Sequence, residues 1–128
     1  MKTKNVLIAV LAAILILTAG IAIGANKFGR PNTILHVITC RLKPDTTPEQ
    51  KQAVVKAIEK MAAEIPGIKN IWTKGIKVQG DRYTDAYVME FANKAAFDAY
   101  VAHPAHKVFE DVYLPVREQS TTHDITNE

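Results

Sequence analysis

The stretch TILHVITCRLKPDTTPEQ, residues 33–50, joins the pattern of a β-strand to the start of a helix. Residues 33–43 are rich in β-branched and apolar side chains, which are typical of a strand. Both faces of this strand are largely apolar, so we expect both to be covered. Thr47 can cap the following helix, Pro48 suits its first position, and Gln50 can complete a capping box. The stretch therefore predicts a buried strand that leads directly into a helix.

The rest of the sequence predicts alternating helices and strands. The first helix has apolar residues at helical spacing and ends at IPG, residues 65–67. Further strands are predicted over residues 68–79, where Gly75 weakens the pattern, over residues 83–91 and, weakly, over residues 120–126. Further helices are predicted from about Asn93 to Ala102 and from Pro104 to about Glu118.

The order β-α-β-β-α-(α)-β is that of a ferredoxin-like α+β domain with an antiparallel sheet. Helices in such a domain cover one face of the sheet only. Because the predicted strands have no clean polar side, a partner sheet is the simplest cover for the other face. The pattern therefore predicts an isologous homodimer through the sheet faces, with Trp72 in the core or the dimer interface.

The N-terminal residues have a different character. Residues 6–25, VLIAVLAAILILTAGIAIGA, contain no charge, and about 20 apolar residues are needed to cross a bilayer. We expect residues 1–25 to be a signal anchor or, alternatively, a cleaved signal peptide, followed by a linker over residues 26–32 and a domain over residues 33–126. Basic residues flank both ends of the run and favour, weakly, a single-pass membrane protein with its domain outside the cytoplasm. Cleavage would make it secreted or periplasmic.

Charge and cysteine content exclude several classes of function. Four of the basic residues precede residue 31, so the net charge of +3 falls to −1 for residues 31–128. No basic patch therefore argues for nucleic-acid binding. The single cysteine, Cys40, cannot form an internal disulfide, and its place in an apolar strand predicts a packed thiol. His123 is expected to be exposed in the C-terminal tail.

Four segments together resemble the stress-responsive A/B-barrel (Dabb) domain family: HVITCRLKPDTTPEQ, IPGIKNI, YTDAYVMEF and YVAHPAHKVFEDV. The resemblance extends over about residues 34–126. It implies a dimeric α+β barrel in which one sheet from each subunit faces the other. One branch of the family contains polyketide cyclases, which use a Tyr/His pair, and related barrels include cofactor-independent monooxygenases.

The resemblance also points to candidate site residues. Tyr100, His103, His106 and His36 stand where the cyclases have their tyrosine, two histidines and strand histidine. Asp85 departs from that branch, which has a histidine there, and this departure leaves the substrate class open. An imidazole, with an ordinary pKa of about 6.5, can remove a proton next to a carbonyl group, and a tyrosine hydroxyl can stabilise the resulting oxyanion.

These residues allow three interpretations. In the first, a cavity between sheet and helices has His106 and Tyr100 as catalytic residues and His36, Asp85, His103 and Phe97 as ligand contacts. In the second, the histidines are structural: His103 caps the second helix beside Pro104, and His106 bonds to the backbone. A third, weaker interpretation makes His36, His103, His106 and Asp85 zinc ligands, but their spacing matches no known metal motif. We expect neither a metal nor another cofactor.

Two functions follow from these interpretations. The first is an exported or membrane-anchored domain that binds a small apolar or carbonyl-containing molecule. The second is an enzyme of the polyketide-cyclase or cofactor-independent monooxygenase type.

Overall fold

The computed structural model describes residues 3–4 and 28–127. The chain divides into two compact units, Met1–Arg30 and Pro31–Glu128. The apolar run over residues 6–25 lies outside the described residues, so its assignment as an anchor or signal stays a prediction. Within residues 3–4 and 28–127, no helix is both long enough and apolar enough to span a bilayer. The fold described below is that of the second unit.

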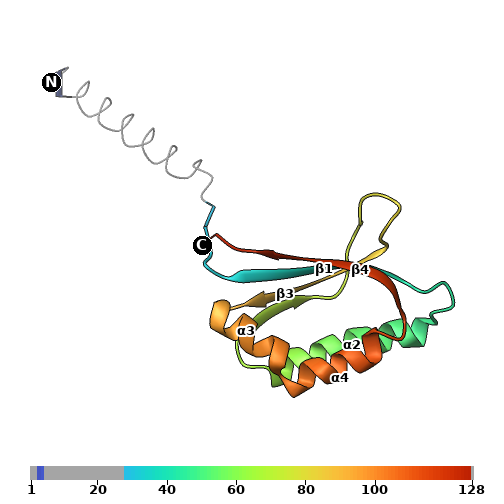
Figure 1. Ribbon diagram of the computed structural model, residues 1–128. Coiled ribbons are helices and arrows are strands. Elements are labelled where there is room, and N and C mark those ends of the chain that lie inside the picture. The colour runs from blue at the N-terminus through green and yellow to red at the C-terminus, as the bar shows by residue number, and fades with distance from the viewer. Residues whose placement is uncertain (1–2, 5–27, 128) are drawn as a thin grey trace. The chain divides into compact units, whose positions relative to one another are not determined.

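An antiparallel sheet and a layer of helices form this unit (Figure 1). The strands run in the order β2-β3-β1-β4. They are β1 (Ile34–Leu42), β2 (Ile68–Trp72), β3 (Asp85–Phe91) and β4 (Arg117–Ile125). The helices α2 (Pro48–Glu64), α3 (Lys94–Ala102) and α4 (Pro104–Tyr113) all lie against one face of the sheet (Figure 1). The predicted ferredoxin-like α+β fold is confirmed.

The start of α2 has the predicted capping box. The amide of Gln50 donates to Thr47 Oγ1 at 3.2 Å, and the amide of Thr47 donates to Gln50 Oε1 at 2.9 Å. These bonds satisfy two backbone amides that would otherwise lack helical partners. The apolar positions of α2 then point to the sheet, where Val54, Ile58 and Met61 are buried.

Several predicted element boundaries are wrong. The strand predicted over residues 68–79 ends at Trp72. Gly75 lies close to Ala86, and Ile76 is fully exposed, so no buried side chain stabilises a longer strand. The helix predicted to reach about Glu118 ends at Tyr113, because Pro115 lacks the amide hydrogen that would continue the helical hydrogen bonds. This early end lets β4 begin at Arg117 rather than at residue 120.

The two faces of the sheet differ in cover. Side chains alternate along β1, so Ile38 and Cys40 face the helices and are buried, whereas Leu35 and Val37 lie on the other face and are only half-buried. Trp72 is paired with Val88 at the edge of that second face and is 49% exposed, so it is not in the core. His123 is exposed, as predicted, but it belongs to β4 opposite Val37 rather than to a tail.

Candidate functional site

Tyr100 lies at the centre of a group of ring side chains that come from β1, β3, α3 and α4. It is only 2% exposed, and its ring centroid lies 4.3 Å from that of His106 and 5.8 Å from that of His36. The rings of Phe91 and Phe97 lie 4.9 Å and 6.2 Å from it. We call these five residues the Tyr100 cluster. The structure therefore brings together His36, Phe97, Tyr100 and His106, while their role in binding or catalysis remains a prediction.

His36 is oriented by a carboxylate on the neighbouring strand. It pairs with Asp124 of β4, and its Nδ1 lies 2.6 Å from Asp124 Oδ1. An ionised carboxylate only accepts hydrogen bonds, so Nδ1 is the donor, and in the neutral ring Nε2 keeps a free lone pair. The His36 side chain is 12% exposed and that of Asp124 48%. Asp124 was not among the predicted site residues.

The junction between α3 and α4 positions the other two histidines. Ala105 N donates to His103 Nδ1 at 3.1 Å, so His103 caps α4, and Pro104 takes the first helical position. His106 Nδ1 lies 3.3 Å from the carbonyl oxygen of Val101, to which it donates. Both structural roles predicted for these histidines are confirmed. In His106 the donation from Nδ1 leaves Nε2 as the unprotonated nitrogen of the neutral ring.

The surroundings of Tyr100 keep its hydroxyl neutral. Burial raises the pKa of Tyr100 well above its ordinary value, and the negative charges of Glu110 and Asp124 raise it further. A phenol with such a pKa stays protonated at physiological pH. Tyr100 is therefore suited to donate a hydrogen bond to a developing oxyanion rather than to accept a proton.

Asp85 is not part of this group. It pairs with Cys40 at the start of β3, whereas His36 pairs with Met89 further along the same strand. Four residues along a strand correspond to about 13 Å. The structure thus places Asp85 at the opposite end of the helix-facing side of the sheet, and the zinc ligand set considered above is not assembled. Among the residues that the structure describes, no group of three or more His, Cys, Asp or Glu could hold a metal ion.

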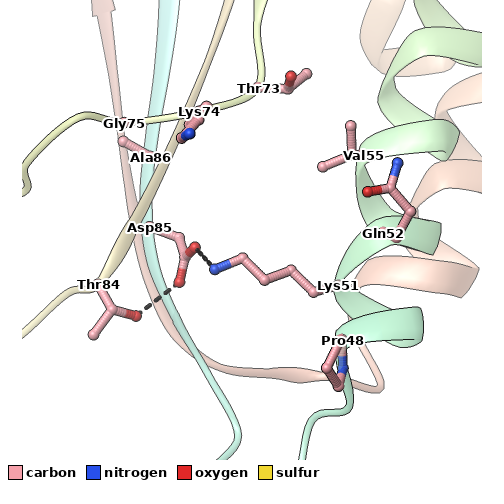
Figure 2. Close-up of a pocket in the computed structure, with 10 residues that line it drawn as sticks. All are labelled: Pro48, Lys51, Gln52, Val55, Thr73, Lys74, Gly75, Thr84, Asp85 and Ala86. Atoms are coloured by element: carbon pink, nitrogen blue, oxygen red, sulfur yellow. Dashed lines mark hydrogen bonds and ion pairs between the residues drawn. The ribbon is translucent and has the colours of Figure 1, made fainter.

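Asp85 instead lines a cavity of about 480 Å³ between α2 and the beginning of β3. Figure 2 shows Lys51 reaching from α2 to Asp85, with which its Nζ forms an ion pair. Thr84 Oγ1 donates to the other carboxylate oxygen of Asp85 at 2.8 Å. We call this space the Asp85 cavity; its remaining lining residues are Pro48, Gln52, Val55, Thr73, Lys74, Gly75 and Ala86.

Polar side chains also lie in the core between these two places. The hydroxyls of Tyr87 and Tyr113 are buried without a hydrogen-bond partner. Burial raises the pKa of the Tyr113 hydroxyl well above its ordinary value, so this group stays protonated at physiological pH. Burial raises the pKa of the Cys40 thiol, which favours its unreactive protonated form and confirms the predicted packed thiol.

Comparison with known proteins assigns the domain to a family. The sequence profile of the Stress responsive A/B Barrel Domain matches residues 34–127. The chain belongs to this family. Olivetolic acid cyclase of Cannabis sativa, a similar protein, is 29% identical over 96 residues, which are 73% of this chain and 95% of the cyclase.

Solved structures agree on the fold of this stress-responsive A/B-barrel protein. A Dabb family protein of Mesorhizobium loti with a ferredoxin-like fold is 26% identical, with a TM-score of 0.64 over 75% of this chain and 97% of the other. A dimeric ferredoxin-like protein of unknown function from Thermobifida fusca is 24% identical, with a TM-score of 0.65 over 79% of this chain and 96% of the other.

Proposed function

We propose that this stress-responsive A/B-barrel domain binds a small carbonyl-containing molecule at the Tyr100 cluster and moves a proton at the carbon next to the carbonyl group. One observation carries the proposal: two imidazoles, each with its Nδ1 engaged, lie 5.8 Å and 4.3 Å, centroid to centroid, from the ring of a buried neutral tyrosine. In both neutral rings the Nε2 lone pair is left for a substrate proton.

The proposed reaction uses each group in one role. His106 Nε2 takes the proton from the carbon next to the carbonyl, and the electron pair of that C–H bond moves to the carbonyl oxygen to form an enolate. The Tyr100 hydroxyl donates a hydrogen bond to the enolate oxygen. The enolate carbon then either attacks a second carbonyl carbon of the same molecule, which closes a ring while the oxygen of that carbonyl takes the proton held by His106, or takes that proton back itself. His36, oriented by Asp124, is a second imidazole whose unprotonated Nε2 can accept a proton from the substrate.

Access to Tyr100 requires α3 to move, because the tyrosine is only 2% exposed. Tyr100 is the one fully buried side chain of α3, whereas α2 buries Val54, Ile58 and Met61. The other apolar contacts of α3, from Ala96 and Phe97, are only partly buried, so this helix can separate from the sheet at a lower free-energy cost than α2. We infer that displacement of α3 admits the ligand.

The similarity to olivetolic acid cyclase supports ring closure as the outcome of proton removal. The similarity does not identify the substrate of this chain. Asp85 lies outside the Tyr100 cluster, and the core beside the cluster contains the hydroxyls of Tyr87 and Tyr113. The proposed substrate class is therefore limited to small molecules with a C–H bond made acidic by an adjacent carbonyl group.

A second candidate function is binding without catalysis. It is favoured by the near-complete burial of Tyr100 and by the backbone bonds of His103 and His106, both of which stabilise the helix junction. In that case the cluster would form the wall of a binding site, and substitution of His106 would change affinity without abolishing any reaction.

Native mass spectrometry with β-keto esters, β-keto thioesters and β-diketones tests the proposal. We expect at least one class to bind the wild-type chain and to bind less to Tyr100→Phe, which removes only the hydroxyl. Tyr83→Phe, a change outside the Tyr100 cluster, is the matched control and should bind as the wild type does. Equal binding to all three chains would contradict the assigned role of Tyr100.

We further propose that the domain is a homodimer through the sheet face that carries Leu35, Val37 and Val88. These three apolar side chains are only half-buried in a single chain, and dimeric proteins share the fold. Association with a second copy would cover it. A chain that sediments as a monomer at micromolar concentration would contradict this proposal.

The apolar run over residues 6–25 is proposed to anchor the protein in a membrane with its domain outside the cytoplasm. Protease added outside the cell, after permeabilisation of any outer membrane, should then digest the domain, while the chain remains in the membrane fraction. A soluble chain that begins near Ala25 would instead indicate a cleaved signal peptide.

A further inference from the structure

The Asp85 cavity is separate from the Tyr100 cluster. Its walls come from the first turns of α2, from the segment after β2 and from the start of β3. The cluster lies about 13 Å further along the sheet, a distance that corresponds to four strand residues. The intervening core is closed, since Tyr87 is only 1% exposed. A ligand of the cavity would therefore bind independently of the proposed reaction.

Lys51 is held in position at the cavity wall. Its Nζ forms an ion pair with Oδ1 of Asp85, whose side chain is only 13% exposed, and Oδ2 of the same carboxylate accepts a hydrogen bond from Thr84. Both carboxylate oxygens are thus engaged within the protein. An ammonium group has three N–H donors, so Lys51 keeps donors that Asp85 does not use. Figure 2 shows its side chain extended across the edge of the cavity.

Lys74 gives the cavity its net charge. It belongs to the segment that follows β2 and lines the cavity on the side opposite α2 (Figure 2). Within residues 3–4 and 28–127 the structure shows no ion pair or hydrogen bond of the Lys74 side chain. Because the charges of Lys51 and Asp85 offset each other, the lining residues carry one net positive charge.

The remaining walls are suited to an apolar body. Val55 on α2 and Ala86 on β3 line the cavity together with the ring of Pro48. A volume of about 480 Å³ is within the range of small-molecule sites in proteins. Thr73 and Gln52 add polar groups that can hydrogen-bond to a ligand.

We propose that the Asp85 cavity binds a small monocarboxylate with a short apolar or aromatic body. The carboxylate would lie between the amines of Lys51 and Lys74, and the body would contact Val55 and Ala86. Asp85 and Thr84 are positioning residues, because they fix the amine of Lys51. One net positive charge matches one carboxylate, whereas a phosphate dianion would leave a charge uncompensated and would make no use of the apolar walls.

Chemical-shift mapping on the full-length chain in a neutral detergent tests this inference. The probes are benzoate, its neutral analogue benzamide, and inorganic phosphate. Benzoate should shift the backbone amide signals of residues 51–55, 73–75 and 84–86 and leave those of Tyr100 and His106 unchanged. Benzamide and phosphate should bind at least tenfold more weakly, because the first lacks the charge and the second lacks the apolar body.

Substitutions identify the lysines responsible. Lys74→Met should raise the dissociation constant for benzoate by about tenfold or more, because one charge-assisted hydrogen bond is lost. Lys77→Met, in the same segment but outside the cavity lining, is the matched control and should bind benzoate normally. Since Lys51→Met alone would leave Asp85 unpaired, the double variant Lys51→Met/Asp85→Asn is used, and it should also lose binding.

Three results would overturn the proposal. They are equal binding of benzoate and benzamide, unchanged affinity in Lys74→Met, and shifts that are confined to the Tyr100 cluster. If no carbonyl compound binds at the Tyr100 cluster in the native mass spectrometry experiment, the benzoate shifts should still be observed. The two proposals can therefore be refuted separately.

Discussion

Replacement of His103 separates the structural from the catalytic histidine at the α3–α4 junction. His103→Ala removes the ring nitrogen that accepts from the amide of Ala105 at the start of α4. His103→Asn keeps an acceptor, because asparagine is among the preferred N-cap residues. The structure therefore predicts a clear loss of stability for the first substitution and little loss for the second.

The magnitude follows from the loss of one helix cap. Replacing an N-cap side chain by alanine costs about 1 kcal/mol, within a range of about 0.5–2 kcal/mol. For a domain of about 100 residues, each 1 kcal/mol lowers the melting temperature by about 4–8 °C. We expect a decrease of that size for His103→Ala and a decrease of less than about 2 °C for His103→Asn, measured by circular dichroism on the full-length chain.

Two results would refute the reasoning. If both substitutions lower the melting temperature equally, the cap is not what His103 contributes. If His103→Asn melts like the wild type but loses activity toward the carbonyl compound found by mass spectrometry, His103 belongs to the reaction and the assignment of His106 as the base is wrong.

Three further predictions concern the core, α3 and the free sheet face. Burial raises the pKa values of Tyr87 and Tyr113, so the unfolded chain loses these protons at a lower pH than the folded chain does. The free energy of unfolding should therefore keep its full value below about pH 10 and decrease as the pH rises further. In denaturant melts, this decrease should be smaller for Tyr87→Phe. Amide hydrogen exchange should be at least tenfold faster in α3 than in the middle of α2, and equal protection would contradict the opening of α3. Val37→Lys should convert the proposed dimer into a folded monomer in sedimentation velocity, whereas an unchanged dimer would assign the interface to another surface.

The fold could be predicted because local signals agreed with one another. The capping box at Thr47 and Gln50, and the proline after His103, fixed helix ends that the structure confirms. The predicted boundaries fail where a single residue overrides the pattern of its neighbours. Pro115 ends α4 early, and Gly75 lies against Ala86 where the strand pattern appeared to continue.

The candidate site was predictable only in part. Helical spacing was sufficient to bring Tyr100 and His106 together, because both lie at one helix junction. The partnership of His36 with Asp124 was missed, because it depends on the register between β1 and β4, and β4 has only a weak strand pattern of its own. Asp85 lies on the same face of the sheet as the Tyr100 cluster but at a different position along the strand. The alternation of residues along a strand indicates only the face on which a side chain lies, so it could not separate Asp85 from the cluster.

Solvent deuterium incorporation into a β-keto ester, followed by proton NMR, tests the central claim most directly. The wild-type chain should exchange the proton between the two carbonyl groups faster than buffer does. His106→Gln should lower the enzymatic rate by about 10²–10⁴-fold, as expected for loss of a general base, with little change in melting temperature, while His103→Asn should retain the rate. Exchange no faster than in buffer for the whole panel of carbonyl compounds, or an undiminished rate in His106→Gln, would contradict the account.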